Sequence, residues 1–309
     1  MAKNVKEVYR EKDAGLFLID LPQDLPGYRQ FISAWLLMTP QAGYLVDPGP
    51  AVTVPVLRAA LASLGVEHLD WVLVTHIHLD HAGGTGDLLQ HFPAAKVVVH
   101  PQSVKHLADP TALWEGSLKT LGKVALSHGR PRPVPPDCFA ERAPGVEILE
   151  TPGHAANHRS YLWGNILFAG EAAGTRCELD GQTYLRPATP PRFFFDAAVS
   201  SLDVLLNKGL EGKVLCHAHY GISQNAGDIL LAHRDQLYLW RDTVAEFLAK
   251  ESGGSREELI AAIWNELKKR DPLLSPYGQL PADIQEREDY YAKNSIRGFV
   301  QYLEELRQK

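Results

Sequence analysis

The chain has 309 residues, of which 45% are hydrophobic and 22% are charged. These proportions are typical of a globular protein and exclude a mainly disordered chain. A chain of this length can form one large domain with an appendage, or two domains, and can bury a sizeable core. The formal net charge is −6. Because nucleic-acid-binding domains are usually basic, this charge argues against a nucleic-acid partner.

The cysteines and the apolar runs bear on the cellular location. Cys138, Cys177 and Cys216 have no CxxC spacing and indicate a reducing compartment rather than a disulfide framework. The first residues are charged and lack the apolar core of a signal peptide. Every apolar run ends before the roughly 18 residues that a transmembrane helix needs. We therefore expect a cytoplasmic protein with no membrane partner.

Short strands and helices alternate in the first part of the chain. Apolar runs bounded by turn residues predict strands over residues 15–19, 31–38, 43–46, 71–75 and 96–99. Apolar residues at helical spacing predict helices over residues 54–64, 84–90 and 101–128. The proline-rich segment 129–136 cannot form regular structure.

The second part of the chain changes character after Gly221. Strands are predicted over residues 146–149, 160–163 and 166–169, which together with the earlier elements indicates an α/β protein with sheets covered by helices. Apolar residues from 229 to 248 then fit one face of a long helix, and Ser255 with Glu258 forms a capping box that opens another. Further helix is predicted over 282–306. We expect a catalytic domain over residues 1–232 and a helical C-terminal extension over residues 233–309.

The segment from Thr75 to His81, with the sequence THIHLDH, carries the strongest chemical signal. Residues i and i+2 of an extended segment point the same way, so His76 and His78 can reach one metal ion together. If the chain turns at Asp80 and His81, these two side chains can face a second ion. Imidazole and carboxylate suit zinc, and also manganese or iron. The simpler interpretation is a polar loop, but four ligand-type residues at this spacing make it much the weaker one.

This motif, one segment before it and three segments after it resemble the signature of the metallo-β-lactamase superfamily. The other segments are LVDPGP around Asp47, TPGH ending at His154, LFAGE ending at Glu171 and CHAHYG around His219. The resemblance covers about residues 15–221 and implies a four-layer αββα sandwich with the metals at one edge between two sheets. It is nearest to the glyoxalase II-like branch.

Carried over residue by residue, the resemblance implies a ligand set for two divalent metal ions, with zinc expected first. The first ion would be held by His76, His78 and His154. The second would be held by Asp80, His81 and His219, with the carboxylate of Glu171 bridging the two ions.

The sequence departs from the family pattern at two of these positions. The family usually has Asp at the bridging position, where this chain has Glu171. His217 and His219 both follow the last strand and compete for the last ligand position; the following Tyr-Gly favours His219. His158 is expected to support the site without binding metal. Asp47 either orients a metal-binding histidine or only forms a turn before Pro48.

The resemblance implies a metal-dependent hydrolase in which a metal-bound hydroxide attacks a small ester-like substrate, of the thioester or lactone class. Asp80 is the expected catalytic residue and would shuttle a proton. The insert at 183–195 is a candidate wall of the substrate pocket, in which Tyr184, Arg186, Arg192 and Phe193 would bind an apolar acyl group with an anionic end. The alternative for these aromatic residues is that they pack the C-terminal helices onto the core.

Three other functions remain open at the level of sequence. A mononuclear iron persulfide dioxygenase would use only part of the ligand set, and Glu171 could disable the second site. An RNase-Z-like phosphodiesterase is disfavoured by the acidic charge, and a binding protein with a degenerate site is disfavoured because every ligand position holds a ligand-type residue. The expected partner is a small acyl compound, and a homodimer is left open.

Overall fold

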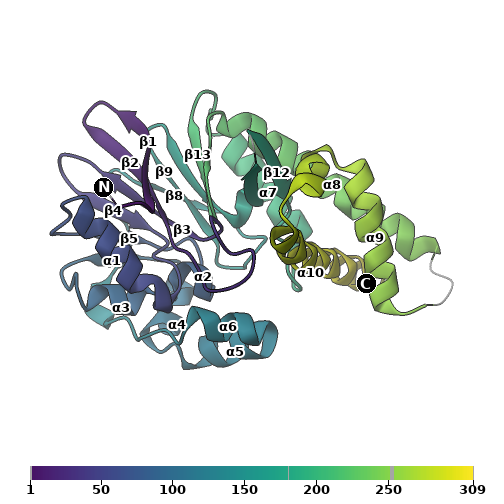
Figure 1. The fold of residues 1–309 in the computed structure, drawn as a ribbon, viewed down its shortest axis with the longest axis horizontal. Helices are drawn as coiled ribbons and strands as arrows, with labels where there is room; N and C mark the ends of the chain where they lie inside the picture. Colours follow the sequence, from purple (N-terminus) through teal and green to yellow (C-terminus); the bar gives the residue numbers. More distant parts are fainter. Residues whose placement is uncertain (1, 180, 251–253, 309) are drawn as a thin grey trace.

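The computed structural model describes residues 2–179, 181–250 and 254–308. Two sheets face each other in the N-terminal part of the chain, shown on the left of Figure 1. The first sheet has the strand order of the sequence and contains β1 (Val5–Glu11), β2 (Ala14–Asp20), β3 (Ser33–Met38), β4 (Gly43–Val46), β5 (Trp71–Leu73), β6 (Lys96–Val98) and β7 (Phe139–Ala140). Strands β1 to β4 pair antiparallel, and β4 to β7 pair parallel.

The second sheet has the order β14-β13-β10-β9-β8. Its strands are β8 (Glu147–Glu150), β9 (Arg159–Trp163), β10 (Ile166–Gly170), β13 (Val214–His217) and β14 (Ile222–Ser223). A separate hairpin of β11 (Thr175–Leu179) and β12 (Gln182–Arg186) follows β10 and lies beside the C-terminal helices.

Ten α-helices accompany these strands within the described residues. They are α1 (Val54–Ser63), α2 (Leu79–Ala82), α3 (Thr85–Leu89), α4 (Val104–Ala108), α5 (Thr111–Leu121), α6 (Lys123–His128), α7 (Phe195–Leu206), α8 (Ala226–Lys250), α9 (Arg256–Arg270) and α10 (Ala282–Arg307).

Successive side chains along a strand pack into different layers of the sandwich. In β2, Leu16 and Leu18 point into the space between the two sheets, where they join Tyr161 and Phe168 of the second sheet. The intervening residue Phe17 points the other way, to the layer that contains α1. A strand whose two faces are both covered is apolar throughout, because successive side chains point to opposite faces. The predicted αββα sandwich is confirmed.

Helix α7 packs on the outer face of the second sheet, α8 packs on α7, and α9 and α10 pack on α8. Leu167 of β10 and Leu215 of β13 share one apolar cluster with Leu230 of α8, Trp264 of α9 and Phe299 of α10. The helical region thus shares an apolar cluster with the outer side of the second sheet. It opens with α8 at Ala226, so the predicted boundary after residue 232 falls inside this helix. The capping box of Ser255 and Glu258 is present at the start of α9.

Several elements differ from the sequence-based expectation. Strand β1, the β11–β12 hairpin and helix α7 were not predicted, since their apolar faces are short or mixed with polar residues. The segment expected to be helical over 101–128 is divided into α4, α5 and α6. Pro110 separates the first two, and Gly122, with a φ of 53°, separates the last two. Among the described residues no helix combines the length and apolarity needed to cross a membrane.

Candidate metal centre

The THIHLDH segment leaves the end of β5 and enters α2. His78 is the residue that precedes α2, and its backbone is extended, with φ −61° and ψ 152°. His76 and His78 therefore lie before the helix, on irregular chain that is extended at His78, whereas Asp80 and His81 lie on the first turn of the helix. This change of backbone divides the four side chains between two neighbouring groups. The turn packs closely: a Cβ at Gly84 would lie 2.7 Å from Cγ2 of Val54.

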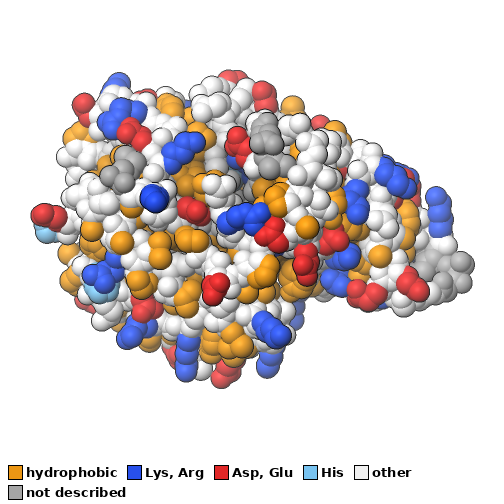
Figure 2. All heavy atoms as spheres, viewed as in Figure 1, with side chains coloured by type: hydrophobic (Ala, Val, Ile, Leu, Met, Phe, Trp, Pro, Cys, Tyr) orange, Lys and Arg blue, Asp and Glu red, His pale blue; other side chains and the backbone are white. Residues whose placement is uncertain are grey.

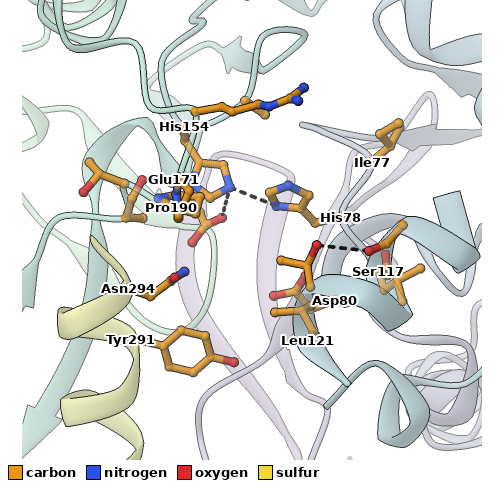
Figure 3. Close-up of a pocket in the computed structure, with 18 of the residues that line it drawn as sticks. Ile77, His78, Asp80, Ser117, Leu121, His154, Glu171, Pro190, Tyr291 and Asn294 are labelled. Carbon is orange, nitrogen blue, oxygen red and sulfur yellow. Dashed lines mark hydrogen bonds and ion pairs between the residues drawn. The ribbon is translucent and has the colours of Figure 1, made fainter. Parts of the chain in front are cut away.

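The first group consists of His76, His78, His154 and Glu171, whose ligand atoms all lie within 4.8 Å of one another. Nδ1 of His78 lies 2.9 Å from Nε2 of His76 and 2.9 Å from Nε2 of His154. Oε2 of Glu171 lies 2.7 Å from Nε2 of His154 (Figure 3). Residues from three separate chain segments thus converge on one point.

The second group consists of Asp80, His81 and His219. Oδ2 of Asp80 lies 3.7 Å from Nε2 of His81 and 3.9 Å from Nε2 of His219. The other carboxylate oxygen of Glu171, Oε1, lies 3.0 Å from Nε2 of His219. The Glu171 carboxylate therefore contacts both groups, with one oxygen directed to each.

The electrostatics of the two groups favour ionised carboxylates. Burial acts to raise the pKa of Asp80, but the charges of His81 and His219 outweigh burial and lower this pKa to about 2. Burial likewise acts to raise the pKa of Glu171. The charge of His154 and its hydrogen bond outweigh burial, so the pKa of Glu171 lies well below its usual value. Burial lowers the pKa of His78 to about 4, with the charge of His154 as the next cause. At neutral pH this ring is neutral and has a free lone pair.

Asp47 contacts His81 of the second group directly and His76 of the first group through Thr75. Its Oδ2 lies 3.1 Å from Nδ1 of His81, and its carboxylate also accepts hydrogen bonds from the backbone N–H (2.8 Å) and the hydroxyl (2.7 Å) of Thr75. Oγ1 of Thr75 in turn lies 3.0 Å from Nδ1 of His76. Asp47 is buried and has a φ of 50°. It therefore orients one histidine of each group, which is more than a turn before Pro48 requires.

His158 and Ala188 fix the remaining ligand-type residues. The backbone N–H of Glu171 donates to Nε2 of His158 at 3.0 Å, and Nδ1 of His158 contacts Oγ1 of Thr151 at 2.8 Å. His158 thus holds the chain at Glu171 and uses both ring nitrogens to do so. Nδ1 of His154 lies 2.8 Å from the carbonyl oxygen of Ala188, so its Nε2 is the nitrogen left to face the other ligand-type residues.

The donor set fits divalent metal ions. Nε2 of His81 is buried and has no hydrogen-bond partner within the described residues, although it lies among carboxylates at 3.7 and 3.8 Å. A buried ring nitrogen without a partner is costly, and a cation in this position would satisfy it. The imidazole and carboxylate donors are those that zinc, manganese and iron accept. Residues able to hold two ions are therefore in place.

The structure separates the two histidines that competed for the last position. His219 joins the second group. Nε2 of His217 instead contacts Oγ of Ser223 at 2.9 Å, and its ring lies outside both groups. The two rings differ because the strand β13 ends at His217 and the chain turns before His219.

A cavity of about 610 Å³ opens directly above the two groups, and His78, Asp80, His154, Glu171 and His219 form part of its wall. One side is made by α5 and α6, including Ser117 and Leu121, and the other by the segment 188–194 (Figure 3). Helix α10 closes one end with Tyr291, Asn294 and Ser295. A volume of this size is that of a small-molecule site.

Two of the four residues predicted to bind substrate lie elsewhere. Arg186 and Arg192 line the cavity, but Tyr184 and Phe193 do not. Tyr184 and Phe193 are buried in the apolar cluster of the C-terminal helices. This position agrees with the alternative interpretation, in which these aromatic residues pack the C-terminal helices onto the core. Phe194, 48% exposed, is the phenylalanine that lines the cavity. Arg186 is also less available than expected, because its guanidinium is buried and paired with Glu288.

Other cavity residues were not identified from the sequence. They come from α5, α6 and α10, and include Ser117, Leu121, His128 and Tyr291. Each is an ordinary residue of a helical pattern, and only the packing of these helices around the ligand-type residues brings it to the site.

The sequence from residue 27 to residue 219, more than half of the chain, matches the family model for the metallo-β-lactamase superfamily. The chain belongs to the metallo-β-lactamase superfamily. All of the ligand-type residues described above fall within the matched part, while α8, α9 and α10 of this superfamily member lie outside it.

Two relatives and one solved structure illustrate the similarity. The metallo-β-lactamase fold-containing protein ST1585 of Sulfurisphaera tokodaii is 31% identical over 170 residues, which cover 51% of this chain and 62% of the relative. A hydroxyacylglutathione hydrolase of Hahella chejuensis is 30% identical over 194 residues, which cover 61% of this chain and 62% of the relative. The alignments thus span less than two thirds of either relative.

The metallo-β-lactamase family protein TTHA1429 of Thermus thermophilus has a similar structure, with a TM-score of 0.63 and 20% identity. The similarity covers 94% of this chain and 93% of that chain. The fold, C-terminal helices included, is therefore shared with a solved structure.

Proposed function

We propose that this protein is a hydrolase that depends on two divalent metal ions and cleaves a small ester-like substrate, with thioesters first and lactones second. The observation that carries the proposal is the position of Glu171, whose two carboxylate oxygens contact two separate groups of ligand-type residues at the base of the cavity. A carboxylate shared in this way could serve two metal ions at once.

The first ion would be held by His76, His78 and His154, and the second by Asp80, His81 and His219, with Glu171 contributing to both. When bound, such ions polarise a substrate oxygen and lower the pKa of water to about 7. Zinc is the first candidate for this donor set, with iron and manganese as alternatives.

The remaining residues prepare the site for this chemistry. Asp47 and Thr75 hold His81 and His76 in fixed orientations, and His158 holds the backbone of Glu171. Asp80 is ionised at neutral pH and lines the cavity. Its Oδ2 lies nearest His81 and His219, so Oδ1 is the oxygen left to exchange a proton, and we assign Asp80 the role of proton shuttle.

The walls of the cavity support an acyl substrate. Leu113, Leu121, Pro190 and Phe194 offer apolar surface on both sides. Arg192 is exposed and makes no ion pair with the described residues, so it can attract an anionic end of the substrate. The acyl class is also supported by relatives that bear the name hydroxyacylglutathione hydrolase. We retain the cytoplasm as the proposed location.

The alternatives receive less support. A mononuclear iron dioxygenase needs one group of ligands, whereas the structure assembles two that share Glu171. For an RNase-Z-like phosphodiesterase we would look for a basic surface. On the face shown in Figure 2, Lys and Arg side chains are interspersed with Asp and Glu.

Metal content and turnover test the proposal together. The protein purified without added metal or chelator is analysed for zinc, iron and manganese, and then assayed with thioesters, lactones and a phosphodiester. We expect about two equivalents of metal per chain and turnover of an acyl substrate that a chelator abolishes. One equivalent of iron with no acyl turnover would contradict the proposal and favour the dioxygenase.

A further inference from the structure

Two tyrosines from distant parts of the chain meet at the end of the cavity. Tyr28 lies between β2 and β3, and Tyr291 lies on α10. Their hydroxyl oxygens are 2.7 Å apart, across a sequence separation of 263 residues. Tyr291 lines the cavity together with Asp80, Glu171 and His219, whereas Tyr28 is buried behind it. Figure 3 shows the Tyr291 ring below Glu171, with its hydroxyl directed towards the Asp80 side of the cavity.

Aromatic packing fixes this pair relative to the second group of ligand-type residues. Phe31 lies between them: its ring centroid is 4.5 Å from that of His219, 5.1 Å from that of Tyr28 and 5.7 Å from that of Tyr291. The guanidinium of Arg287 covers the Phe31 ring at 3.9 Å. The tyrosine pair is therefore held at a set position beside His219 rather than lying loosely at the cavity surface.

The hydrogen count leaves one hydroxyl proton unused. Two phenols carry two O–H hydrogens, and the bond between them uses one. Within the described residues neither hydroxyl has another hydrogen-bond partner. Burial raises the pKa of Tyr28 to about 12 and that of Tyr291 above its usual value, so both hydroxyls keep their protons at neutral pH. When Tyr28 donates to Tyr291, the proton of Tyr291 is free to point into the cavity.

We propose that Tyr291, oriented by Tyr28, donates a hydrogen bond to the acyl oxygen of the substrate, where negative charge develops during attack. This inference rests on the hydrolase function proposed above. Tyr291 keeps its proton and transfers none. A donor that already accepts a hydrogen bond is strengthened by it, so Tyr28 acts as a positioning residue through Tyr291. The C-terminal helices would then supply a catalytic residue and not only a brace.

The test uses the full-length, metal-loaded protein and the variants Tyr291→Phe, Tyr28→Phe and the double variant. Tyr290→Phe is the matched control, since Tyr290 is the neighbouring residue on α10 and is 45% exposed. Metal content and thermal unfolding show whether each variant remains folded and loaded. We expect Tyr291→Phe to lower kcat by about 10²-fold with little change in KM, as loss of one oxyanion donor does.

Tyr28→Phe should lower kcat by about tenfold, the equivalent of one hydrogen bond. The double variant should be no slower than Tyr291→Phe, because Tyr28 acts only through Tyr291. A second measurement is independent of turnover. The carbonyl stretch of a bound ketone analogue, in which a methylene group replaces the ester oxygen or sulfur, should move to higher frequency in Tyr291→Phe and stay unchanged in Tyr290→Phe.

The outcomes separate this inference from the proposed function. An active wild-type protein whose Tyr291→Phe variant matches Tyr290→Phe in kcat and in carbonyl frequency would overturn the role of Tyr291 alone. Independent, additive effects of the two substitutions would overturn the role of Tyr28. A wild-type protein that turns over no acyl substrate would overturn the hydrolase function and this inference with it.

Discussion

Oδ2 of Asp47 lies 3.1 Å from Nδ1 of His81, at a buried position where the Asp47 backbone is left-handed. This contact fixes which nitrogen of His81 is free to bind metal, and such supporting carboxylates commonly contribute 10–100-fold to metal affinity. Asn tolerates the left-handed backbone and is close to Asp in size, so Asp47→Asn tests the charge with little other change.

We expect Asp47→Asn to weaken metal binding by about tenfold, the lower end of that range, because the amide still accepts one hydrogen bond. Competition with a fluorescent chelator measures the affinity. The control is Asp70→Asn, whose Oδ2 accepts a hydrogen bond from the backbone N–H of Gly43 at 2.8 Å, away from the site. Equal affinities for the two variants would show that Asp47 only shapes its turn.

His217 and His219 provide a matched pair of substitutions. His219→Ala should lose about one equivalent of metal, since it removes one of the three ligand-type residues of the second group. His217→Ala should retain the full metal content and only lower the free energy of unfolding, because this ring is buried and bonded to Ser223. Elemental analysis after dialysis distinguishes them, and the reverse pattern would make His217 the ligand.

Glu171→Gln removes the negative charge between the two groups while keeping the shape of the side chain. The backbone hydrogen bond to His158 at 3.0 Å should hold the residue in place. Without this charge two divalent cations repel each other more strongly. We expect binding of the second metal equivalent to weaken by more than about tenfold relative to the first. Isothermal calorimetry resolves the two steps, and an unchanged second step would mean that Glu171 does not bridge.

A buried ion cluster joins α10 to the β11–β12 hairpin. Glu288, which is 0% exposed, pairs with both Arg186 and Arg287. Glu288→Gln leaves two buried guanidinium groups without their carboxylate, so we expect the free energy of unfolding to fall by about 3–5 kcal/mol. Urea unfolding measures this change. Glu286→Gln, on an exposed face of the same helix, should stay within about 0.5 kcal/mol of the wild-type value. A similarly small loss in Glu288→Gln would show that water reaches the cluster.

We expect Asp20, at the end of β2, to make the free energy of unfolding depend on pH. Burial raises its pKa from 3.8 to about 6, and its Oδ1 has no hydrogen-bond partner within the described residues. The folded state therefore binds the proton more tightly than the unfolded state. The contribution of Asp20 to stability is complete below the lower of these pKa values and is lost as the pH rises through about 6.

In Asp20→Asn this loss should disappear, so the free energy of unfolding should fall less between about pH 4 and pH 6 than in the wild type. Urea unfolding at a series of pH values tests this. Asp24→Asn, at an exposed position of the following segment, should keep the wild-type dependence. Identical slopes in all three proteins would show that Asp20 titrates normally.

The sequence, through its resemblance to the metallo-β-lactamase superfamily, predicted the sandwich and six of the seven ligand-type residues outright, and it favoured His219 over His217 for the seventh. His76, His78, Asp80 and His81 stand within six residues of one another, so local backbone geometry alone brings them to one place. His154, Glu171 and His219 each follow a strand or a turn with a recognisable pattern. Such motifs can be identified from the sequence because they depend only on neighbouring residues and on the strand that precedes them.

Only the tertiary structure decided which other side chains reach the cavity. Phe193 and Phe194 are adjacent and chemically identical, yet one is buried among the C-terminal helices and the other lines the cavity. The meeting of Tyr28 with Tyr291 depends on how α10 docks against the segment between β2 and β3. Side chains of this kind are placed by packing between elements far apart in the chain, and that packing has no periodic or local signature in the sequence.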